Sequence, residues 1–356
     1  MQNHYTTITI CFSVRCARDA RPLILRAVIS LDTRLVALLA CPYDRRSLVV
    51  DGPRLRCPEG HTFPIVHGVP VLLREDAAPT HHLWNTTDAD IRRFAAAEQP
   101  APAPGAVDPF VERWLVATCG RLYRRCSLPL ARYPIPDLDP PEGNSRTFLD
   151  VGSNWGRWAL GATRAGYKAV AVDPSLEAAL AGARVARQLG LPVHYVVGDV
   201  RDLPFRNDSF DVVFSYSVLQ HLDKDVVRRA LEQMAVVMAR QGLVRVQIAN
   251  VLGPKQLLNH ARELIKRAWS RRAAYPFRVR PWTPRELVDT FSSCIGPATL
   301  SADGFFTLNA QPADRDLLPP FERLIVRAST QLCAISRRWP PLVQVADSLM
   351  VEARSR

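Results

Sequence analysis

The chain has 356 residues, of which 47% are hydrophobic, and its formal net charge is +12. This length accommodates a catalytic domain of about 200 residues together with a smaller unit. The most apolar long stretch, residues 22–40, is interrupted by Arg26, Asp32 and Arg34, so no membrane-spanning helix is expected. The 8 cysteines lack the spacing of a disulfide scaffold, which is typical of a protein in the reducing cytoplasm.

Residues 1–34 form an N-terminal extension for which little order is expected. Its apolar stretch 8–14 is followed by Arg15 and Arg18, and this order of charges is wrong for a signal peptide. Residues 35–75 are predicted to form a small β-rich module, because two knuckle-like turns flank a short hairpin with Asp51-Gly52 at its tip.

The two turns of this module carry four potential zinc ligands, Cys41, Asp44, Cys57 and His61. Zinc ribbons use C-x2-C turns or a C-x3-H turn, and the carboxylate of Asp44 is a harder ligand than the usual thiolate. Two outcomes stay open: the four residues hold a structural zinc, or the site is degenerate and the apolar strands alone maintain the fold.

The end of the module, Phe63-Pro-Ile-Val-His-Gly-Val-Pro-Val-Leu-Leu73, resembles the YPI-x-x-GIP-x-LL ending of the zinc-ribbon-like domain in the tRNA-methyltransferase activator family. The resemblance covers about forty residues. It implies a zinc-ribbon-like module, which in that family's relatives also occurs fused ahead of bacterial methyltransferases. Residues 76–145 are predicted to be a proline-rich linker followed by a helix over about 108–130.

A strand, a glycine loop, a helix and a second strand are predicted over residues 147–175. An apolar strand ends at Val151, Gly152 and Gly156 follow, and a helix fits 157–164. Glycines let a ligand approach bare backbone, and the helix N-terminus offers N–H groups to it. Asp173 ends the second strand, 21 residues after Gly152, where an acid can accept both hydroxyls of a ribose. The stretch therefore predicts a nucleoside site.

The composition of the loop indicates which nucleoside is bound. The pyrophosphate-binding pattern G-x-G-x-x-G is absent, and Asp150 precedes the first glycine. A carboxylate there repels phosphate and suits a cationic, amino-bearing ligand. The loop resembles motif I of the class I S-adenosylmethionine-dependent methyltransferases. Residues 196–214, with Gly198-Asp199 and the later Ser-Phe-Asp sequence, resemble the GD-x-x-x-LPF…SFD-x-V pattern of their small-molecule branch.

The resemblance implies roles for individual residues. Asp199 would bond the adenine amino group, and the backbone at Val200 would meet the ring edge. The full set of cofactor-binding residues that it implies is Asp150, Gly152, Ser153, Asn154, Gly156, Asp173, Pro174, Asp199, Val200 and Ser215. Trp155 is a candidate to pack on the methionine portion, whereas Trp158 is assigned to the core.

Strands and helices alternate through residues 146–356, with helices at 176–189 and 223–238 and strands at 194–197, 212–214 and 243–248. This alternation predicts an α/β fold, a doubly wound, mostly parallel, Rossmann-like sheet. The family implies seven strands, the last antiparallel and matched by 348–353. A helix starting at Thr283, a strand at 305–308 and a helix at 317–336, with Leu324 facing inward, complete the prediction.

A basic insertion is predicted at residues 251–282. Residues 261–280 carry seven basic residues against Glu263, and this block suits an anionic substrate, RNA, an anionic membrane surface or simply a solvated helix face. Just past the fourth strand, His221 is a candidate general base, with loop orientation as the alternative role; Tyr216 and Gln220 are candidate pocket residues.

Three functions remain open at this stage. The first is methylation of a small molecule or an anionic glycan or lipid precursor. The second is methylation of RNA, because a C-x3-H knuckle ahead of a catalytic domain also resembles a ribosomal RNA guanine methyltransferase. The third is a non-catalytic binding protein that retains the cofactor fold. The absence of an Asp/Asn-Pro-Pro-Tyr motif after the fourth strand disfavours exocyclic amines of nucleic acids. The oligomeric state is left open.

Overall fold

The computed structural model describes residues 5–12, 25–76, 79, 85–140, 146–255, 257–258, 279–280, 282–307 and 309–355, with side chains described from residue 31 onward. Most of the predicted basic block at 261–280 lies outside the described residues. Within the described part of the chain, none of the helices has the length and apolar character that crossing a bilayer requires.

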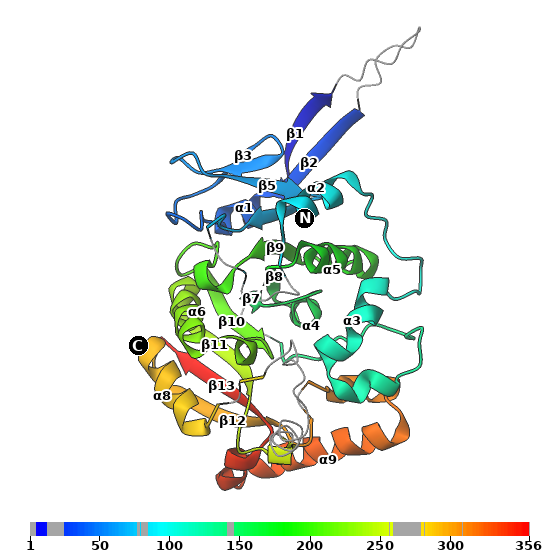
Figure 1. The fold of residues 1–356 in the computed structure, drawn as a ribbon, viewed down its shortest axis with the longest axis vertical. Coiled ribbons are helices and arrows are strands. Elements are labelled where there is room, and N and C mark those ends of the chain that lie inside the picture. Colours follow the sequence, from blue (N-terminus) through cyan, green and yellow to red (C-terminus); the bar gives the residue numbers. More distant parts are fainter. Residues whose placement is uncertain are drawn as a thin grey trace, which may run out of the picture.

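A mixed sheet of eleven strands, in the order β12-β13-β11-β10-β7-β8-β9-β6-β5-β4-β3, runs through the molecule (Figure 1). Its central strands β7, β8, β9, β10 and β11 are parallel, whereas β13 is antiparallel to both β11 and β12. The strands from residue 147 onward are β7 (Thr147–Val151), β8 (Lys168–Asp173), β9 (His194–Gly198), β10 (Phe210–Tyr216), β11 (Met238–Ala249), β12 (Ala298–Gly304) and β13 (Ser348–Arg354).

The prediction of a seven-stranded sheet beside a separate small module is wrong about where the sheet ends. β6 (Val69–Leu72) pairs in parallel with β9 through Val71↔Val197 and Leu72↔Gly198. The antiparallel strands β5 (Thr62–Val66), β4 (Arg54–Arg56) and β3 (Val49–Asp51) continue from it. Because an open sheet edge exposes unpaired N–H and C=O groups, β6 satisfies the edge of β9. Local sequence patterns indicate which segments form strands, but they do not indicate which strands pair.

Helices cover both faces of the sheet, as the doubly wound prediction requires. α4 (Arg157–Arg164) and α5 (Leu176–Leu189) contribute to one buried cluster, and α6 (Lys224–Val237) and α8 (Pro284–Cys294) to the other. The predicted bounds of α4 and α5 are confirmed. For α5, the Ser175 hydroxyl accepts the N–H of Ala178, and Gly190 ends the helix in the left-handed region at φ 65°.

The N-terminal part begins with β1 (Tyr5–Phe12) and β2 (Leu25–Asp32), which pair as an antiparallel hairpin that projects away from the body (Figure 1). α1 (Thr33–Leu38) follows the hairpin, and α2 (Asp88–Ala96) and α3 (Pro109–Cys119) follow the module. The helix predicted over 108–130 is shorter, because Gly120 at φ 98° ends α3 and the 3-10 helix η1 (Arg121–Arg125) follows.

The C-terminal predictions are confirmed only in part. The strand expected at 305–308 is instead β12, whose alternating small and polar side chains give a weak apolar signal. After the 3-10 helix η4 (Pro312–Leu317), α9 (Pro320–Ser336) forms as expected, but Leu324 is 60% exposed rather than inward. The 3-10 helix η5 (Pro340–Val345) precedes β13.

Candidate active site

A cleft of about 150 Å³ opens at the carboxyl ends of β7, β8 and β10. This edge is where the order of the parallel strands reverses and where open α/β sheets bind their ligands. Nine residues proposed for the site from the sequence line the cleft, namely Gly152, Ser153, Asn154, Trp155, Asp173, Pro174, Val200, Tyr216 and His221. The structure thus brings together residues from the ends of four strands.

The loop between β7 and α4 contains three residues with left-handed backbone conformations and packs closely against its neighbours. Gly152, Asn154 and Gly156 have φ values of 73°, 50° and 78°. A Cβ on Gly152 would lie 2.5 Å from Val218, and one on Gly156 would lie 2.7 Å from the hydroxyl of Tyr195. The two glycines are therefore required both by conformation and by space.

Asp173 occupies the end of β8 and faces the loop. Its carboxylate accepts the backbone N–H of Asn154 at 2.7 Å and that of Ser175 at 3.0 Å. Burial raises its pKa to about 6, although these two hydrogen bonds oppose the increase. A carboxylate with remaining acceptor capacity thus lines the cleft, where it can accept hydrogen bonds from a bound ligand.

Asp150 lies behind the loop rather than in the cleft lining. It is 1% exposed and accepts the N–H of Ala159, in the first turn of α4, at 3.0 Å. Burial raises its pKa to about 7, and the nearby Asp173 adds to this increase. Ser215 is also buried, and its hydroxyl donates to the carbonyl of Val151. Both side chains brace the loop from the sheet side.

The buried carboxyl of Asp150 makes stability depend on pH. In the folded protein the pKa of Asp150 is raised above its ordinary value of 3.8. The contribution of this carboxyl group to stability is therefore fully present below about pH 4 and is lost as the pH rises through about 7. We expect Asp150→Asn, which retains an acceptor for Ala159, to raise the free energy of unfolding at pH 8 by about 1–2 kcal/mol. Urea denaturation at pH 8 and pH 4 checks this, because the gain should vanish at the lower pH. A gain of equal size at both pH values would contradict it.

Asp199 is engaged by its own chain. The backbone N–H of Arg201 donates to it at 2.8 Å, and the Arg201 guanidinium donates at 2.9 and 2.5 Å. Its neighbour Val200 lines the cleft, whereas Asp199 itself is not in the lining. The sequence could not indicate this pairing, because an arginine two residues from an acid is common on solvated turns.

The opposite wall of the cleft is aromatic. The rings of Trp158 and Tyr216 contact each other at a tilt of 32°, with centroids 4.2 Å apart. The Tyr216 hydroxyl donates to Asp303 at 2.7 Å and accepts from Gln311 at 2.9 Å. Trp158, which the sequence assigned to the core, is half-buried and lines the cleft, whereas Trp155 contributes to the lining although its side chain is fully buried.

Of the other polar candidates near this wall, only His221 lines the cleft. It lies on η3 (Leu219–His221), and Arg280 donates to its backbone carbonyl at 2.6 Å. Gln220 points away, because its amide contacts the Ser217 hydroxyl and the N–H of Ala249. Sequence reasoning missed Asn309, whose Oδ1 is buried without a hydrogen-bond partner among the described residues and whose position in a loop gave no periodic signal.

A buried ion pair supports the cleft from below. Arg157, at the start of α4, lies 3.1 Å from Asp314 in η4, and the two side chains are 3% and 0% exposed. Tyr123 donates to the same carboxylate, and burial raises the pKa of its hydroxyl. Because Arg157 lines the cleft, this pair connects η4 to the cleft and to the start of α4.

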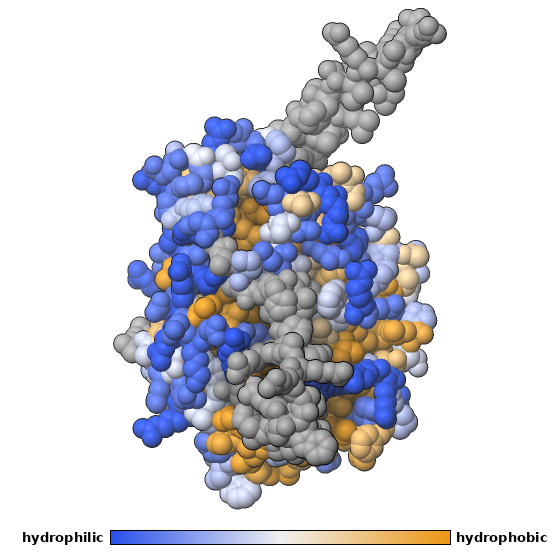
Figure 2. All heavy atoms as spheres, viewed as in Figure 1, coloured by the Kyte–Doolittle hydropathy of each residue, from blue (hydrophilic) through white to orange (hydrophobic). Residues whose placement is uncertain are grey.

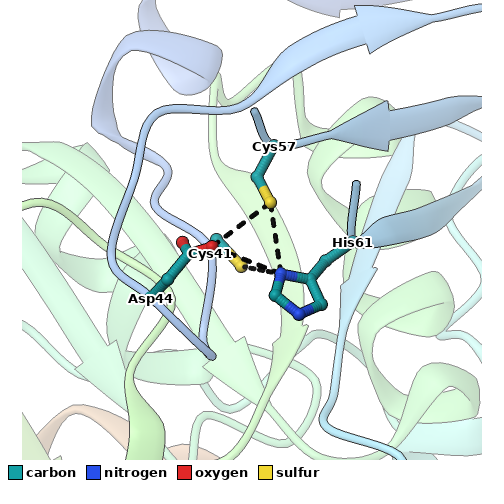
Figure 3. Close-up of side chains that lie close together, drawn as sticks. All are labelled: Cys41, Asp44, Cys57 and His61. Carbon is teal, nitrogen blue, oxygen red and sulfur yellow. Dashed lines mark hydrogen bonds and ion pairs between the residues drawn. The ribbon is translucent and has the colours of Figure 1, made fainter. Parts of the chain in front are cut away.

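The four potential metal ligands of the module meet at one point (Figure 3). Their ligand atoms all lie within 4.8 Å of one another. His61 Nδ1 is 3.2 Å from Cys57 Sγ, 3.6 Å from Cys41 Sγ and 3.3 Å from Asp44 Oδ2. A tetrahedral zinc with ordinary bond lengths separates its ligand atoms by about 3.3–3.8 Å, so the set has the size of a zinc site.

The module is attached to the segment that follows β9. Arg45 donates to the carbonyl of Phe205 and to the side chain of Asn207. The backbone N–H of Ala40 donates to the carbonyl of Pro204, and Leu39 forms an isolated bridge with Phe205. This segment begins at η2 (Val200–Asp202), which contributes Val200 to the wall of the cleft. The part of the module that carries the potential metal ligands therefore contacts the same short segment that borders the cleft.

Residues 148–242 match a family model described as a methyltransferase domain. The YcgJ protein from Bacillus subtilis is 18% identical, with 60% of this chain and 93% of that chain covered and a TM-score of 0.39. A SAM-dependent methyltransferase from Methanosarcina mazei is 16% identical, with 62% and 99% covered and a TM-score of 0.43.

A third solved structure is phosphoethanolamine N-methyltransferase 2 from Haemonchus contortus in complex with S-adenosyl-L-methionine. It is 13% identical, with 60% of this chain and 50% of that chain covered and a TM-score of 0.40. The match to the methyltransferase-domain model covers residues 148–242, which is less than half of the chain.

Proposed function

We propose that the protein is an S-adenosylmethionine-dependent methyltransferase. The observation that carries the proposal is the placement of Asp173 against the Gly152–Gly156 loop in an open cleft. Two features of that loop favour a sulfonium nucleoside over a phosphate-bearing one: it lacks the G-x-G-x-x-G pattern, and Asp150 lies beneath it. The match of residues 148–242 to a methyltransferase domain supports the same reading.

The residues in the cleft suit S-adenosylmethionine in the following way. Asp173 would accept the ribose hydroxyls, and the backbone of Gly152, Ser153 and Asn154 would hold the amino acid portion. Val200 and Pro174 would border the adenine, and Asp199 would bond its amino group with the acceptor capacity that Arg201 leaves unused. Asp150, Gly156 and Ser215 shape and brace the loop rather than contact the ligand.

The acceptor would lie on the wall formed by Trp158, Tyr216 and His221. When bound, the cofactor would supply an electrophilic methyl group, with its sulfur as the leaving group of an in-line displacement. The cleft contributes alignment and exclusion of water, which account for much of such a rate enhancement. His221 can take the proton that the acceptor loses. We propose a small molecule or an anionic glycan or lipid precursor as the acceptor.

Transfer of a labelled methyl group tests this function. Purified protein is incubated with labelled S-adenosylmethionine and cell extract fractionated into RNA, lipids and small molecules. The proposal expects label in the lipid or small-molecule fraction, and reduced incorporation by His221→Asn with unchanged cofactor affinity. Label in RNA alone would show that the acceptor is RNA rather than a lipid or a small molecule. No incorporation into any fraction would favour a non-catalytic binding protein.

We also propose that Cys41, Asp44, Cys57 and His61 hold a structural zinc. The support is the spacing of their ligand atoms and the burial of both thiols. Tyr43 stacks on the His61 ring at a centroid distance of 4.4 Å and so fixes its orientation.

We further propose that the chain is divided into a zinc-ribbon-like module at residues 35–75 and a catalytic unit at residues 146–356. The six described cysteines are free, and a reducing cytoplasm is the proposed compartment.

Metal removal should affect both the module and the cofactor cleft. We expect a zinc-to-protein ratio near one, and we expect chelation or Cys57→Ser to lower Tm. Cofactor affinity should also fall about threefold to tenfold, because the turns contact the segment that follows Val200. Metal analysis, thermal unfolding and calorimetry measure these effects, with Cys294→Ser as the matched control. A ratio near zero with an intact fold would reject the zinc.

A further inference from the structure

The outer face of α9 carries large apolar side chains that nothing in the described structure covers. Phe321, Leu324, Ile335 and, just past the helix, Trp339 are 65%, 60%, 49% and 58% exposed. Figure 2 shows apolar surface at the end of the molecule where α9 lies. Single exposed apolar residues are ordinary, but four such large ones on one short segment indicate an interaction surface.

These side chains occupy one side of the helix. At about 100° per residue, Phe321, Leu324 and Ile335 fall within an arc of about 60°. The side of α9 that packs on the protein is different and carries the buried residues Glu322, Val326, Ser329 and Ser336. The helix therefore has a second apolar stripe that its own fold does not use.

Exposed arginines lie on one side of the stripe and just past the end of the helix. Arg323, Arg327, Arg337 and Arg338 are exposed, and none forms an ion pair with a described carboxylate. Arg323 donates to the backbone carbonyls of Leu318 and Asp316. The single acid in residues 320–345, Glu322, is 7% exposed. The exposed surface thus combines apolar side chains with positive charge and no negative charge.

We propose that this α9 face, defined by Phe321, Leu324, Ile335 and Trp339 with the four bordering arginines, docks on the surface of an anionic lipid bilayer. An amphipathic helix with aromatic and aliphatic residues on one side and basic residues beside them lies in the interface plane, with its apolar stripe among the acyl chains and its cations at the headgroups. The 17-residue length of α9 is ample for such a contact.

Two other occupants fit the charge and composition less well. A second copy meeting this face about a two-fold axis would bring both sets of arginines together without an intervening acid. RNA would engage the arginines but would leave the aliphatic stripe of Leu324 and Ile335 without a partner, because phosphates and sugars offer it no apolar surface.

The docked face would lie close to the candidate active site. η4 immediately precedes α9 and holds Asp314, which pairs with the cleft residue Arg157. Asn309, a few residues earlier, lines the same cleft. Docking through α9 would therefore hold the cleft near the membrane surface, but the binding itself does not depend on the proposed methyl transfer.

Vesicle flotation of the full chain tests the proposal. We expect partitioning onto vesicles of phosphatidylglycerol and phosphatidylcholine to exceed that onto phosphatidylcholine alone by about tenfold or more, and to weaken as salt is raised. The pair F321S and L324S should reduce partitioning about tenfold, and the pair R337Q and R338Q should reduce it at low salt. Because all four side chains are exposed, these variants are expected to fold normally.

Matched substitutions elsewhere separate this face from general charge and hydrophobicity. Val49→Ser removes a similarly exposed apolar residue in the module, and the pair R92Q and R240Q removes the same charge from other surfaces. These controls should float like the wild type. Equal binding to neutral and anionic vesicles, or equal loss in the controls, would overturn the proposal. A concentration-dependent dimer abolished by F321S, or RNA retention abolished by R337Q and R338Q without flotation, would assign the face to those partners instead.

Discussion

Replacing Asp173 with alanine is expected to weaken binding of S-adenosylhomocysteine by about 100-fold or more. The variant removes the acceptor for two ribose hydroxyls, and hydrogen bonds to a charged group are each worth about 1.5–3 kcal/mol. It also releases the N–H groups of Asn154 and Ser175, which the carboxylate now holds in position. Loop geometry and direct contact are therefore lost together.

Calorimetry on two further variants makes this result specific. Asp173→Asn keeps one oxygen acceptor but loses the charge, so we expect an intermediate loss of about tenfold. Asp289→Ala removes an exposed carboxylate on α8 and should leave the affinity unchanged. Thermal unfolding establishes that each protein is folded. A folded Asp173→Ala protein with wild-type affinity would mean that the ribose is held elsewhere.

Replacing Arg157 with methionine is expected to lower the free energy of unfolding by about 3–5 kcal/mol. The substitution leaves the carboxylate of Asp314 buried, with Tyr123 as a hydrogen-bond donor and Arg132 3.7 Å away. A buried charge that has lost its closest partner is among the most destabilising consequences of a single substitution. Since Arg157 also lines the cleft, cofactor affinity should fall as well.

The magnitude depends on burial, and two comparisons test that dependence by urea denaturation. The double variant Arg157→Met with Asp314→Leu removes both charges and should recover much of the lost stability. Arg285→Met breaks the exposed pair with Asp289 on α8, whose side chains are 92% and 70% exposed, and should cost less than about 0.5 kcal/mol. Equal effects of Arg157→Met and Arg285→Met would contradict the role of the buried pair.

Much of the central fold follows from local sequence signals. The bounds of α4 and α5 follow from such signals, because Gly156 precedes the first helix, Ser175 caps the second and Gly190 ends it. The strands that carry the site are apolar runs with little ambiguity of period. The positions of Gly152 and Asp173 could also be predicted, since the carboxyl ends of parallel strands meet at one edge.

The parts that escaped prediction depend on contacts between distant residues. The pairing of β6 with β9 joins two apolar segments whose sequences specify strands but not partners. Arg157 and Asp314 are 157 residues apart, and neither has a local feature that indicates the other. Trp158 lies on an amphipathic helix beside the glycine loop, where periodicity alone cannot distinguish packing in the core from lining a cleft.

The most direct test is a set of calorimetric titrations of the purified full chain with S-adenosylhomocysteine, NAD and ATP under one condition. The account predicts that S-adenosylhomocysteine binds at one site per chain, that Asp173→Ala removes this binding, and that neither phosphate-bearing nucleotide binds. Binding of NAD or ATP that depends on Asp173, with no heat from S-adenosylhomocysteine, would contradict it.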